Sequence, residues 1–433
     1  MPTSEALGAL TAAVKSNDAA QVAGVLRRFP DLTQTIDEPL PGLSFDAAPL
    51  HAAVWQHNRE MIDVLLGAGA DVNARTGWWA GGFGVLDGAD LELVPFLVER
   101  GARVDAHAAA RLGQLARLEE LLTAAPSLVH ARGGDGQMPL HVAASIEIAE
   151  YLLERGADID ARDIDHESTP AQYMVRERQD VARYLIGRGC RTDILMAAAV
   201  GDQDLIRRHL ETDSESIRTA VTDEYFPKRN PRSGGTIYMW TLGASKTPHA
   251  VAREFGHEDV VQLLMARSPA ELKLAQACEF GDEMTVRALL ASQPDLARSL
   301  PAGDRRKIAD AARDGNLGAV RLMLQAGWPV DARGQHNATS LHWAAFNGHA
   351  EMTREILRYE PPLEDRRNEF NGTPVHWAVY GSVHGWRCKT GDYEGTVVAL
   401  LRAGAKAPPL TDELEASEPV RAVLRRYAGS GPG

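Results

Sequence analysis

The sequence predicts an all-α fold, a curved solenoid of helix-turn-helix units with short β-hairpin fingers. Related stretches recur along the chain at a period of about thirty residues, which is typical of repeat architectures. Within each stretch, apolar residues lie three or four positions apart, as they do on one face of a helix. Many stretches end at a Gly-Ala pair, where glycine can adopt the left-handed conformation that ends a helix.

The clearest repeats begin with a turn that starts a helix. They read PLHAAVWQHNREMIDVLLGAGADVNA, MPLHVAASIEIAEYLLERGADIDA, TPHAVAREFGHEDVVQLLMARS, TSLHWAAFNGHAEMTREILRYE and TPVHWAVYGSVHGWRCKTGDYEGTVVALLRAGA. Threonine caps the free amides of the first turn, and proline lacks an N–H that this turn does not use. Small alanine pairs allow two helices to approach closely. The pattern resembles the ankyrin family, in which TPLH opens the first of two antiparallel helices.

A shorter form of the repeat lacks the TPLH turn. It reads LTAAVKSNDAAQVAGVLRRFPDL, HAAARLGQLARLEELLTAAPSL, LMAAAVGDQDLIRRHLETDSESI and LAQACEFGDEMTVRALLASQPDL. With ADAARDGNLGAVRLMLQAGWPVDA, both forms give about twelve repeats. The predicted organisation is a capping repeat (1–41), repeats (42–221), an inserted long hairpin (222–245), repeats with an insert at 381–392 (246–408), and a C-terminal cap and tail (409–433).

Composition and charge exclude several classes of function. The 433 residues are 44% hydrophobic and 24% charged, as in ordinary folded proteins. The formal net charge of -13 argues against nucleic acid as a partner. The sequence has no run of apolar residues as long as a membrane span, so we expect a cytoplasmic protein that does not enter membranes. The spacing of Cys190, Cys278 and Cys388 predicts no disulfide and no metal site, and we expect no cofactor.

The resemblance implies structural roles for recurring histidines and tryptophans. The TPLH histidine hydrogen-bonds the finger backbone in ankyrin repeats, and here it is His51, His141, His342 and His376. Trp343 and Trp377 are expected in the core, because a helix position repeated in register packs on its neighbour, and the alternative is a pocket. Trp328 replaces the usual Ala of the Gly-Ala-Asp close and is expected as a satellite core residue.

Three segments depart from the repeat and predict a binding site. ARTGWWAGGFGVLDGAD has three glycines where the first helix of a repeat begins, which weakens that helix. TDEYFPKRNPRSGGTIYMWTLGASK alternates apolar and polar residues after a turn-rich stretch, which predicts a long β-hairpin. GSVHGWRCKTGD interrupts the last clear repeat. Because all three are rich in aromatic or basic residues, we expect them to face one shared cavity on the concave face.

The ligand-binding candidates are the aromatic and basic residues of these segments, together with the residue after the Ala pair of the first helix, which should face solvent. They are Trp55, Trp78, Trp79, Tyr225, Arg232, Trp240, Phe346, Tyr380 and Trp386. The alternative for each is packing, or a solvated loop.

Acid/base candidates are fewer. Asp87 lies in the weakened helix, where burial would raise its pKa and make it an acid. The others are carboxylates at finger tips or at the insert's end and one histidine, namely Asp165, Glu369, Asp392 and His384. His166 and His384 could shuttle protons near neutral pH, but both are expected as surface histidines. Such carboxylates also serve as helix caps or solvated groups.

Two classes of function remain open from the sequence. The first is a recognition protein that binds a specific protein or small molecule on an aromatic concave face. The second is an enzyme that performs acid/base chemistry, such as glycoside cleavage, elimination, isomerisation or cyclisation, on a bulky small molecule in a pocket closed by the three segments.

Overall fold

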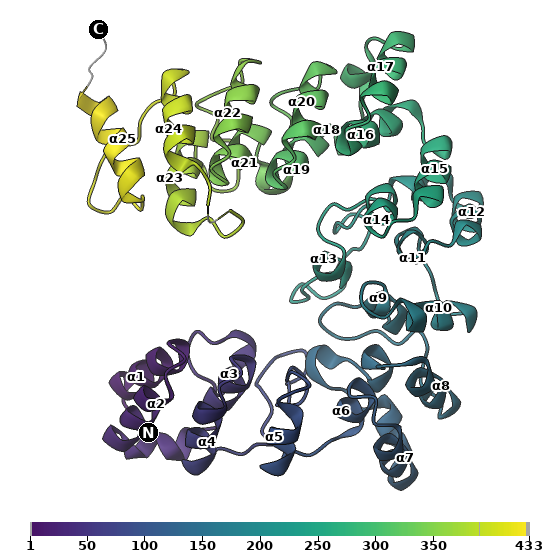
Figure 1. Ribbon diagram of the computed structural model, residues 1–433, viewed down its shortest axis with the longest axis vertical. Helices are drawn as coiled ribbons and strands as arrows, with labels where there is room; N and C mark the ends of the chain where they lie inside the picture. Colours follow the sequence, from purple (N-terminus) through teal and green to yellow (C-terminus); the bar gives the residue numbers. More distant parts are fainter. Residues whose placement is uncertain (1, 389, 430–433) are drawn as a thin grey trace. The chain divides into compact units, whose positions relative to one another are not determined.

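The computed structural model describes residues 2–388 and 390–429 (Figure 1). The chain forms two compact units, Met1–Val261 and Gln262–Gly433. Within the described residues the fold is all-α, and the only β-type pairing is one antiparallel bridge between Arg333 and Thr339. The predicted all-α solenoid of repeats is therefore confirmed. None of the helices in the described part of the chain is both long enough and apolar enough to cross a membrane.

The first unit contains α1 (Ser4–Lys15), α2 (Ala19–Arg28), α3 (Pro49–Trp55), α4 (Arg59–Gly67), α5 (Val94–Glu99), α6 (Ala106–Arg111), α7 (Leu115–Ala124), α8 (Ile146–Glu154), α9 (Pro170–Met174), α10 (Gln179–Gly187), α11 (Ile194–Val200), α12 (Gln203–Thr212), α13 (Tyr238–Thr241) and α14 (Pro248–Glu254). The division between the units falls within α15 (Glu258–Arg267). The second unit contains α16 (Ala270–Phe280), α17 (Glu283–Ser292), α18 (Ala302–Arg305), α19 (Lys307–Arg313), α20 (Leu317–Gln325), α21 (Ser340–Phe346), α22 (Ala350–Leu357), α23 (Pro374–His384), α24 (Tyr393–Arg402) and α25 (Glu418–Gly429). Short 3₁₀ turns are η1 (Pro30–Thr35), η2 (Ser44–Asp46), η3 (Pro126–His130), η4 (Gly134–Gly136), η5 (Pro139–Val142), η6 (Ser214–Arg218), η7 (Leu296–Ser299) and η8 (Gln335–Asn337).

A Gly-Asp pair makes the turn between the two helices of several repeats. Gly201 ends α11 in the left-handed conformation, with φ at 73°, and the side chain of Asp202 accepts a hydrogen bond of 2.8 Å from the Leu205 amide. Gly281 and Asp282 make the same turn between α16 and α17. The carboxylate satisfies an amide that the new helix leaves free, so the second helix begins at a defined residue.

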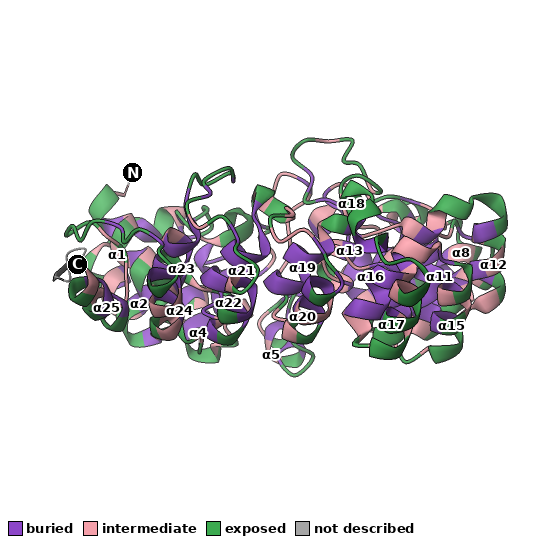
Figure 2. Cartoon of the chain, turned by 90° about the horizontal axis from the view of Figure 1, so that it is seen from above, coloured by how far each residue is buried: buried purple, intermediate pink, exposed green. Residues whose placement is uncertain are grey.

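The core of each unit lies between the first helices of successive repeats. Every residue of α11 and of α21 is buried, whereas the second helix of a repeat buries one face only (Figure 2). Alanine permits this burial because its small side chain lets neighbouring helices pack closely. Trp328, Trp343 and Trp377 belong to the core of the second unit, as predicted.

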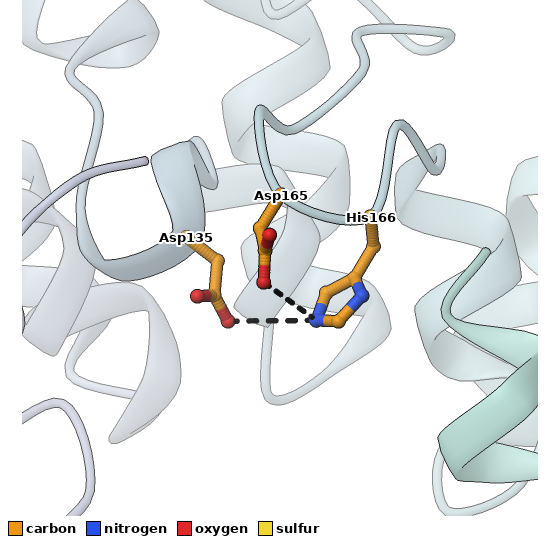
Figure 3. Close-up of side chains that lie close together, drawn as sticks. All are labelled: Asp135, Asp165 and His166. Atoms are coloured by element: carbon orange, nitrogen blue, oxygen red, sulfur yellow. Dashed lines mark ion pairs between the residues drawn. The ribbon is translucent and has the colours of Figure 1, made fainter. Parts of the chain in front are cut away.

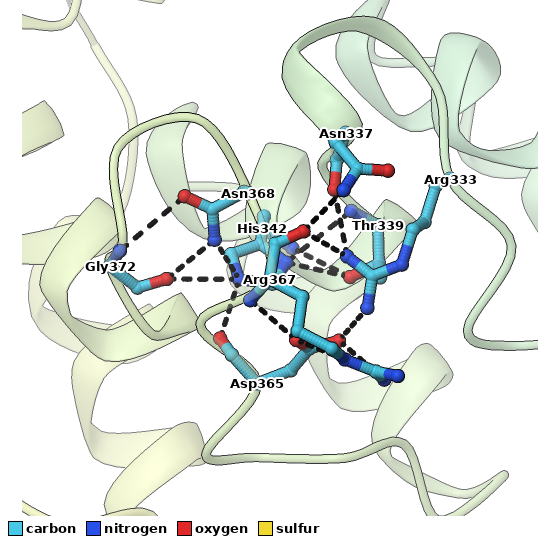
Figure 4. A network of polar contacts seen from close by, with 8 residues as sticks. All are labelled: Arg333, Asn337, Thr339, His342, Asp365, Arg367, Asn368 and Gly372. Carbon is cyan, nitrogen blue, oxygen red and sulfur yellow. Dashed lines mark hydrogen bonds and ion pairs between the residues drawn. The ribbon is translucent and has the colours of Figure 1, made fainter.

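The TPLH histidines bind the finger backbone. Nε2 of His342 lies 3.1 Å from the Asp365 carbonyl, and Nδ1 lies 2.8 Å from the Thr339 hydroxyl (Figure 4). His51 and His141 contact the carbonyls of Ala74 and Ser168 in the same way, at 3.1 and 3.2 Å. These three repeats are thus fastened to the next finger along the chain, which confirms the structural interpretation of their histidines. The fourth, His376, contacts the Thr373 hydroxyl of its own turn at 2.6 Å.

Two local predictions are wrong. Residues 222–245 form turns followed by the short helix α13, and not a long β-hairpin. Their polar backbone groups bond to neighbouring loops: the Gly234 amide, for example, donates to the Asp165 carbonyl at 3.1 Å. The weakened helix expected near Gly84 is absent altogether, since residues 81–93 form turns that lead into α5.

Candidate functional site

Long fingers of the first unit reach across repeats whose own fingers are short. The repeats α6–α7 and α11–α12 begin with an aspartate cap, Asp105 or Asp193, in place of a long finger. The finger at 74–84 spans the first of them and meets the finger at 131–138, where the Asp135 amide donates to the Gly81 carbonyl at 3.2 Å. The insert at 222–245 spans the second and meets the finger at 161–169. Two of the three departures from the repeat are therefore bridging fingers.

Aromatic rings follow the first bridging finger. The ring of Phe45 lies 5.9 Å from that of Trp55 and 5.2 Å from that of Trp78, and Trp78 lies 6.2 Å from Trp79. The guanidinium of Arg232 lies over Trp79, 4.5 Å from the ring centre, which is a cation–π contact. The structure thus brings predicted residues from two departures together. Tyr225 is half-exposed in the same insert.

Asp135, Asp165 and His166 converge beside these bridging fingers (Figure 3). Nε2 of His166 lies 3.7 Å from Oδ2 of Asp135 and 3.7 Å from Oδ2 of Asp165. The other oxygen of each carboxylate accepts a hydrogen bond, from the Trp78 indole at 3.0 Å and from the Gly234 amide at 3.1 Å. Both donors belong to the bridging fingers, so these fingers orient the cluster.

The cluster is short of positive charge. Burial raises the pKa of Asp135 to about 6, with Asp165 and Asp163 adding to the rise, although His166 and the Trp78 indole lower it. Asp163 is also buried, and burial raises its pKa. Within the described residues, no Lys or Arg forms an ion pair with these three carboxylates. The prediction that His166 lies at the surface is wrong, because the insert covers it.

Asp87 does not have the environment expected of an acid. Burial alone would raise its pKa, but neighbouring His107, the Arg75 guanidinium and the Gly84 amide outweigh burial, and the pKa lies below its usual value. Arg75 is 2.8 Å from the carboxylate, and the Gly84 amide donates to it at 2.7 Å. Asp87 is thus an ionised group that fixes the turn after the first bridging finger, and the expected raised pKa is wrong.

A cavity of about 770 Å³ opens in the second unit. It is formed by the finger tips at residues 336 and 370–372, helices α21 and α23, the loop after α23, and the segment before α25. Its aromatic and histidine lining is His336, Trp343, Phe346, Phe370, His376, Trp377, Tyr380, His384 and Trp386. The cavity therefore contains three of the predicted ligand-binding residues, all from this unit.

The inner wall of this aromatic cavity is packed edge to face. The rings of Trp343 and Trp377 are 5.3 Å apart at 85°, and Phe346 lies 6.0 Å from each of them. The indole N–H groups of both tryptophans are buried without a hydrogen-bond partner in the described residues. Phe346 is buried, so the prediction that it faces solvent is wrong, although it still contributes to the wall.

The mouth of the aromatic cavity combines exposed rings and carboxylates. Tyr380 stacks on His384 at 4.4 Å, and Trp386 is 68% exposed. Nε2 of His384 lies 3.1 Å from the Glu415 carboxylate, and Glu413 also lines the mouth. Tyr380 and His384 both belong to helix α23, which continues to His384. The insert predicted to begin at residue 381 therefore starts with an added helical turn.

The remaining acid/base candidates have structural contacts. Asp392 caps α24 by accepting a hydrogen bond of 2.7 Å from the Gly395 amide. Glu369 is exposed and lies 2.7 Å from Nδ1 of His336. Of the five candidates, Asp87 lies beside buried His107 at 3.4 Å, and Asp165 joins the cluster with Asp135 and His166.

The sequence reasoning missed several finger-tip residues that share one position. In each repeat this position is three residues before the one that aligns with the threonine of TPLH. The residues found there are Phe45, Asp135, His166, His336 and Phe370. Neighbouring tips touch or converge: His336 and Phe370 are 5.2 Å apart, and His166 and Asp135 belong to the cluster. Aligning the repeats on this position would have found both sites.

Comparison with known proteins agrees with the repeat pattern. A family model described as ankyrin repeats in three copies matches residues 106–196 and 308–387, and a single ankyrin-repeat model matches residues 46–77. The chain is 33% identical over 94 residues to the E3 ubiquitin-protein ligase XB3 of Oryza sativa subsp. japonica, covering 22% of this chain and 21% of that protein. It is 36% identical over 72 residues to the palmitoyltransferase Hip14 of Drosophila melanogaster, covering 17% of this chain and 11% of that protein. The chain therefore spans about a tenth to a fifth of the length of these relatives.

Among solved structures, the chain is similar to the human ASB11 ankyrin repeat domain. The identity is 17%, the match covers 60% of this chain and 99% of that domain, and the TM-score of 0.32 is too low to support an inference. The matched family models and the confirmed repeat fold show that the chain is an ankyrin-repeat protein.

Proposed function

We propose that this protein is a recognition protein and that its aromatic cavity receives a bulky side chain of a partner protein or a small ligand of similar shape. The observation that supports this best is the cavity of about 770 Å³ with exposed aromatic rings at its mouth. Its volume is within the range of about 300–1,000 Å³ that ligand sites occupy. Holding Trp386 and Tyr380 near each other in solvent gives little folding energy, whereas such residues often anchor partners.

Charge at the mouth favours a cationic or neutral occupant over an anionic one. Glu413 and Glu415 stand at the opening, and the nearby histidine His384 already has a carboxylate partner. Aromatic faces attract cations, and Arg, Lys and quaternary ammonium groups are the usual examples. We therefore infer that the occupant is an aromatic or aliphatic group that bears a positive charge.

Three probes of equal bulk test this inference in the full chain. Benzyltrimethylammonium, neutral neopentylbenzene and anionic phenylmethanesulfonate would be titrated while tryptophan fluorescence is recorded. We expect the cation to bind most tightly and the anion most weakly. Trp386→Ala should weaken cation binding by about tenfold or more, because an anchoring aromatic contributes about 2 kcal/mol.

Trp240→Ala is the matched control, since Trp240 is a similarly exposed tryptophan of the first unit, 74% exposed against 68% for Trp386. It should leave probe affinity unchanged, and both variants should keep the wild-type melting temperature. Equal affinity of wild type and Trp386→Ala for the cation would refute the proposed occupant. Selection from a random peptide library, with Trp386→Ala as the counter-selection, then separates a protein partner from a small ligand. Basic-aromatic peptides that depend on Trp386 indicate the protein partner.

A further inference from the structure

We propose that the first unit binds one divalent transition-metal ion, Zn²⁺ by preference, through Oδ2 of Asp135, Oδ2 of Asp165 and Nε2 of His166. These ligand atoms all lie within 4.8 Å of one another (Figure 3). None of the three accepts or donates a hydrogen bond in the described residues. The inference is independent of the recognition proposed for the second unit, because it rests on other residues.

Nε2 of His166 faces the two carboxylates without forming a hydrogen bond in the described residues. Its Nδ1 lies 3.0 Å from the Gly235 carbonyl, and a carbonyl only accepts, so Nδ1 donates this bond. In the neutral ring Nε2 is then a bare acceptor. The side chain is only 10% exposed, and Nε2 is 3.7 Å from each Oδ2, too far for a hydrogen bond.

Each of the two nitrogen–oxygen distances fits a shared ion. An ion at about 2.1 Å from a nitrogen and an oxygen that are 3.7 Å apart joins them at an angle of about 120°. That angle lies near the tetrahedral and trigonal values that zinc accepts. A proton on Nε2 would point at one carboxylate or the other, whereas an ion between them reaches both.

Each ligand is oriented by a hydrogen bond through its other polar atom. The Trp78 indole holds Oδ1 of Asp135, the Gly234 amide holds Oδ1 of Asp165, and the Gly235 carbonyl holds His166. Metal sites use such outer contacts to aim their ligands. Asp163 differs from these ligands because both of its oxygens already accept hydrogen bonds, from the amides of His166 and Ser168 and from the Tyr173 hydroxyl. We therefore do not include Asp163 among the metal ligands.

The local charge favours a bound cation. Two carboxylates with their oxygens facing each other in a buried site repel unless a proton or a metal ion lies between them. A bound divalent ion would compensate both carboxylates at once.

The ligand set selects the class of ion. One imidazole with two carboxylates favours zinc and its neighbours in the first transition series over Mg²⁺ and Ca²⁺, which prefer oxygen ligands alone. Three protein ligands leave a fourth position for water or another ligand atom. The exposed ring of Trp240 lies 6.4 Å from the His166 ring, so its fluorescence can report the ion.

The test uses the full, untagged chain after treatment with a chelator. Calorimetric titration should show one Zn²⁺ ion per chain, and Co²⁺ should give the visible absorption of a protein-bound ion, which Zn²⁺ then displaces. His166→Asn and Asp165→Asn should each weaken binding at least hundredfold. Trp78→Phe, which keeps the ring but removes the indole donor, should weaken binding about tenfold.

His57→Asn is the matched control, because His57 also lies beside a carboxylate, Asp90, at 3.0 Å, but at an exposed position. It should bind Zn²⁺ like the wild type. Circular dichroism of the metal-free variants checks that they fold. The Co²⁺ spectrum is recorded on the wild-type protein, so this part of the test does not depend on the folding of any variant. The proposal is overturned by a Co²⁺ spectrum equal to that of the free ion, by Zn²⁺ binding that both ligand variants retain, or by tighter binding of Mg²⁺ or Ca²⁺ than of Zn²⁺.

Discussion

Asp365 is a buried carboxylate that two arginines neutralise at the base of a finger. Its side chain accepts hydrogen bonds from the side chains of Arg333 and Arg367, and from the Arg367 amide at 2.9 Å (Figure 4). Burial alone would raise the pKa of Asp365, but these contacts outweigh burial and lower the pKa to about 2. The carboxylate therefore stabilises the fold only while it is ionised.

This pKa predicts how stability depends on acid. A depressed folded pKa contributes stability that is present above the unfolded pKa of about 4 and is lost as the pH falls towards 2. Asp365→Asn should lower the free energy of unfolding by about 2 kcal/mol at pH 7 and flatten its pH dependence between pH 4 and 2. Urea unfolding at several pH values measures both effects. If the free energy of unfolding of Asp365→Asn fell between pH 4 and 2 as steeply as that of the wild type, Asp365 would not be the titrating group.

Single residues were predictable where the repeat fixes their position. The TPLH histidines and the core tryptophans recur in register, so their roles followed from the pattern. Asp135 and His166 were missed as partners, because their proximity depends on how neighbouring fingers stack. For Asp87, burial was foreseen, but the nearby Arg75 guanidinium comes from a segment whose fold was not predictable.

The last helix, α25, closes the core of the second unit. Val420, Val423 and Leu424 are fully buried against that core, while the helix begins at Glu418. The C-terminal cap predicted from residues 409–433 thus corresponds to a helix with one apolar face. Because a repeat buries its face only against a neighbour, removing this helix exposes the preceding repeat.

Removal of residues 413–433 should therefore lower the melting temperature and the solubility. Leu424→Ala gives a milder test, and we expect it to lower the free energy of unfolding by about 2–5 kcal/mol. Met284→Ala is the matched control, because Met284 is an exposed apolar residue of α17. Thermal and chemical unfolding report the change, and a truncated chain as stable as the full one would show that α25 is dispensable.

The secondary structure of the insert at 222–245 could not be predicted from its sequence. Its TIYMW alternation suits a strand, but a short apolar run also suits a helical turn, and local pattern alone does not decide between them. Here the tertiary contacts decide: the Tyr238 hydroxyl donates to Asp193 at 3.0 Å, and the Ile237 amide donates to the Ser168 hydroxyl at 3.0 Å. Both contacts anchor the insert on other repeats, which the sequence does not show.

Across the first unit, the bridging fingers add contacts between repeats that are not neighbours. In an ordinary solenoid each repeat contacts only the next one, so the array can open locally. Here the repeats α6–α7 and α11–α12 lie beneath fingers that are fastened on both sides of them. We expect hydrogen exchange of α9 to α14 to occur in one cooperative step, since opening α11 alone would leave the bridging finger strained.

Replacing residues 224–235 by a two-residue turn tests this coupling. The shortened finger loses the contacts of Arg232, Ser233 and Gly234, so amides of α11 and α12 should exchange sooner than those of α9. Amides of the second unit serve as the internal standard. Simultaneous exchange of α9 to α12 in the shortened protein would contradict the idea.

The bridging fingers also restrict how the array can change over evolution. Where each unit meets only its neighbours, a whole unit can be added or lost without changing the contacts of distant units. A finger that spans one short-finger repeat has a fixed reach, however, so an added or lost unit beneath it would separate Trp78 from Asp135, or Gly235 from His166. Finger length therefore fixes the number of units beneath each bridging finger, between residues 74 and 247.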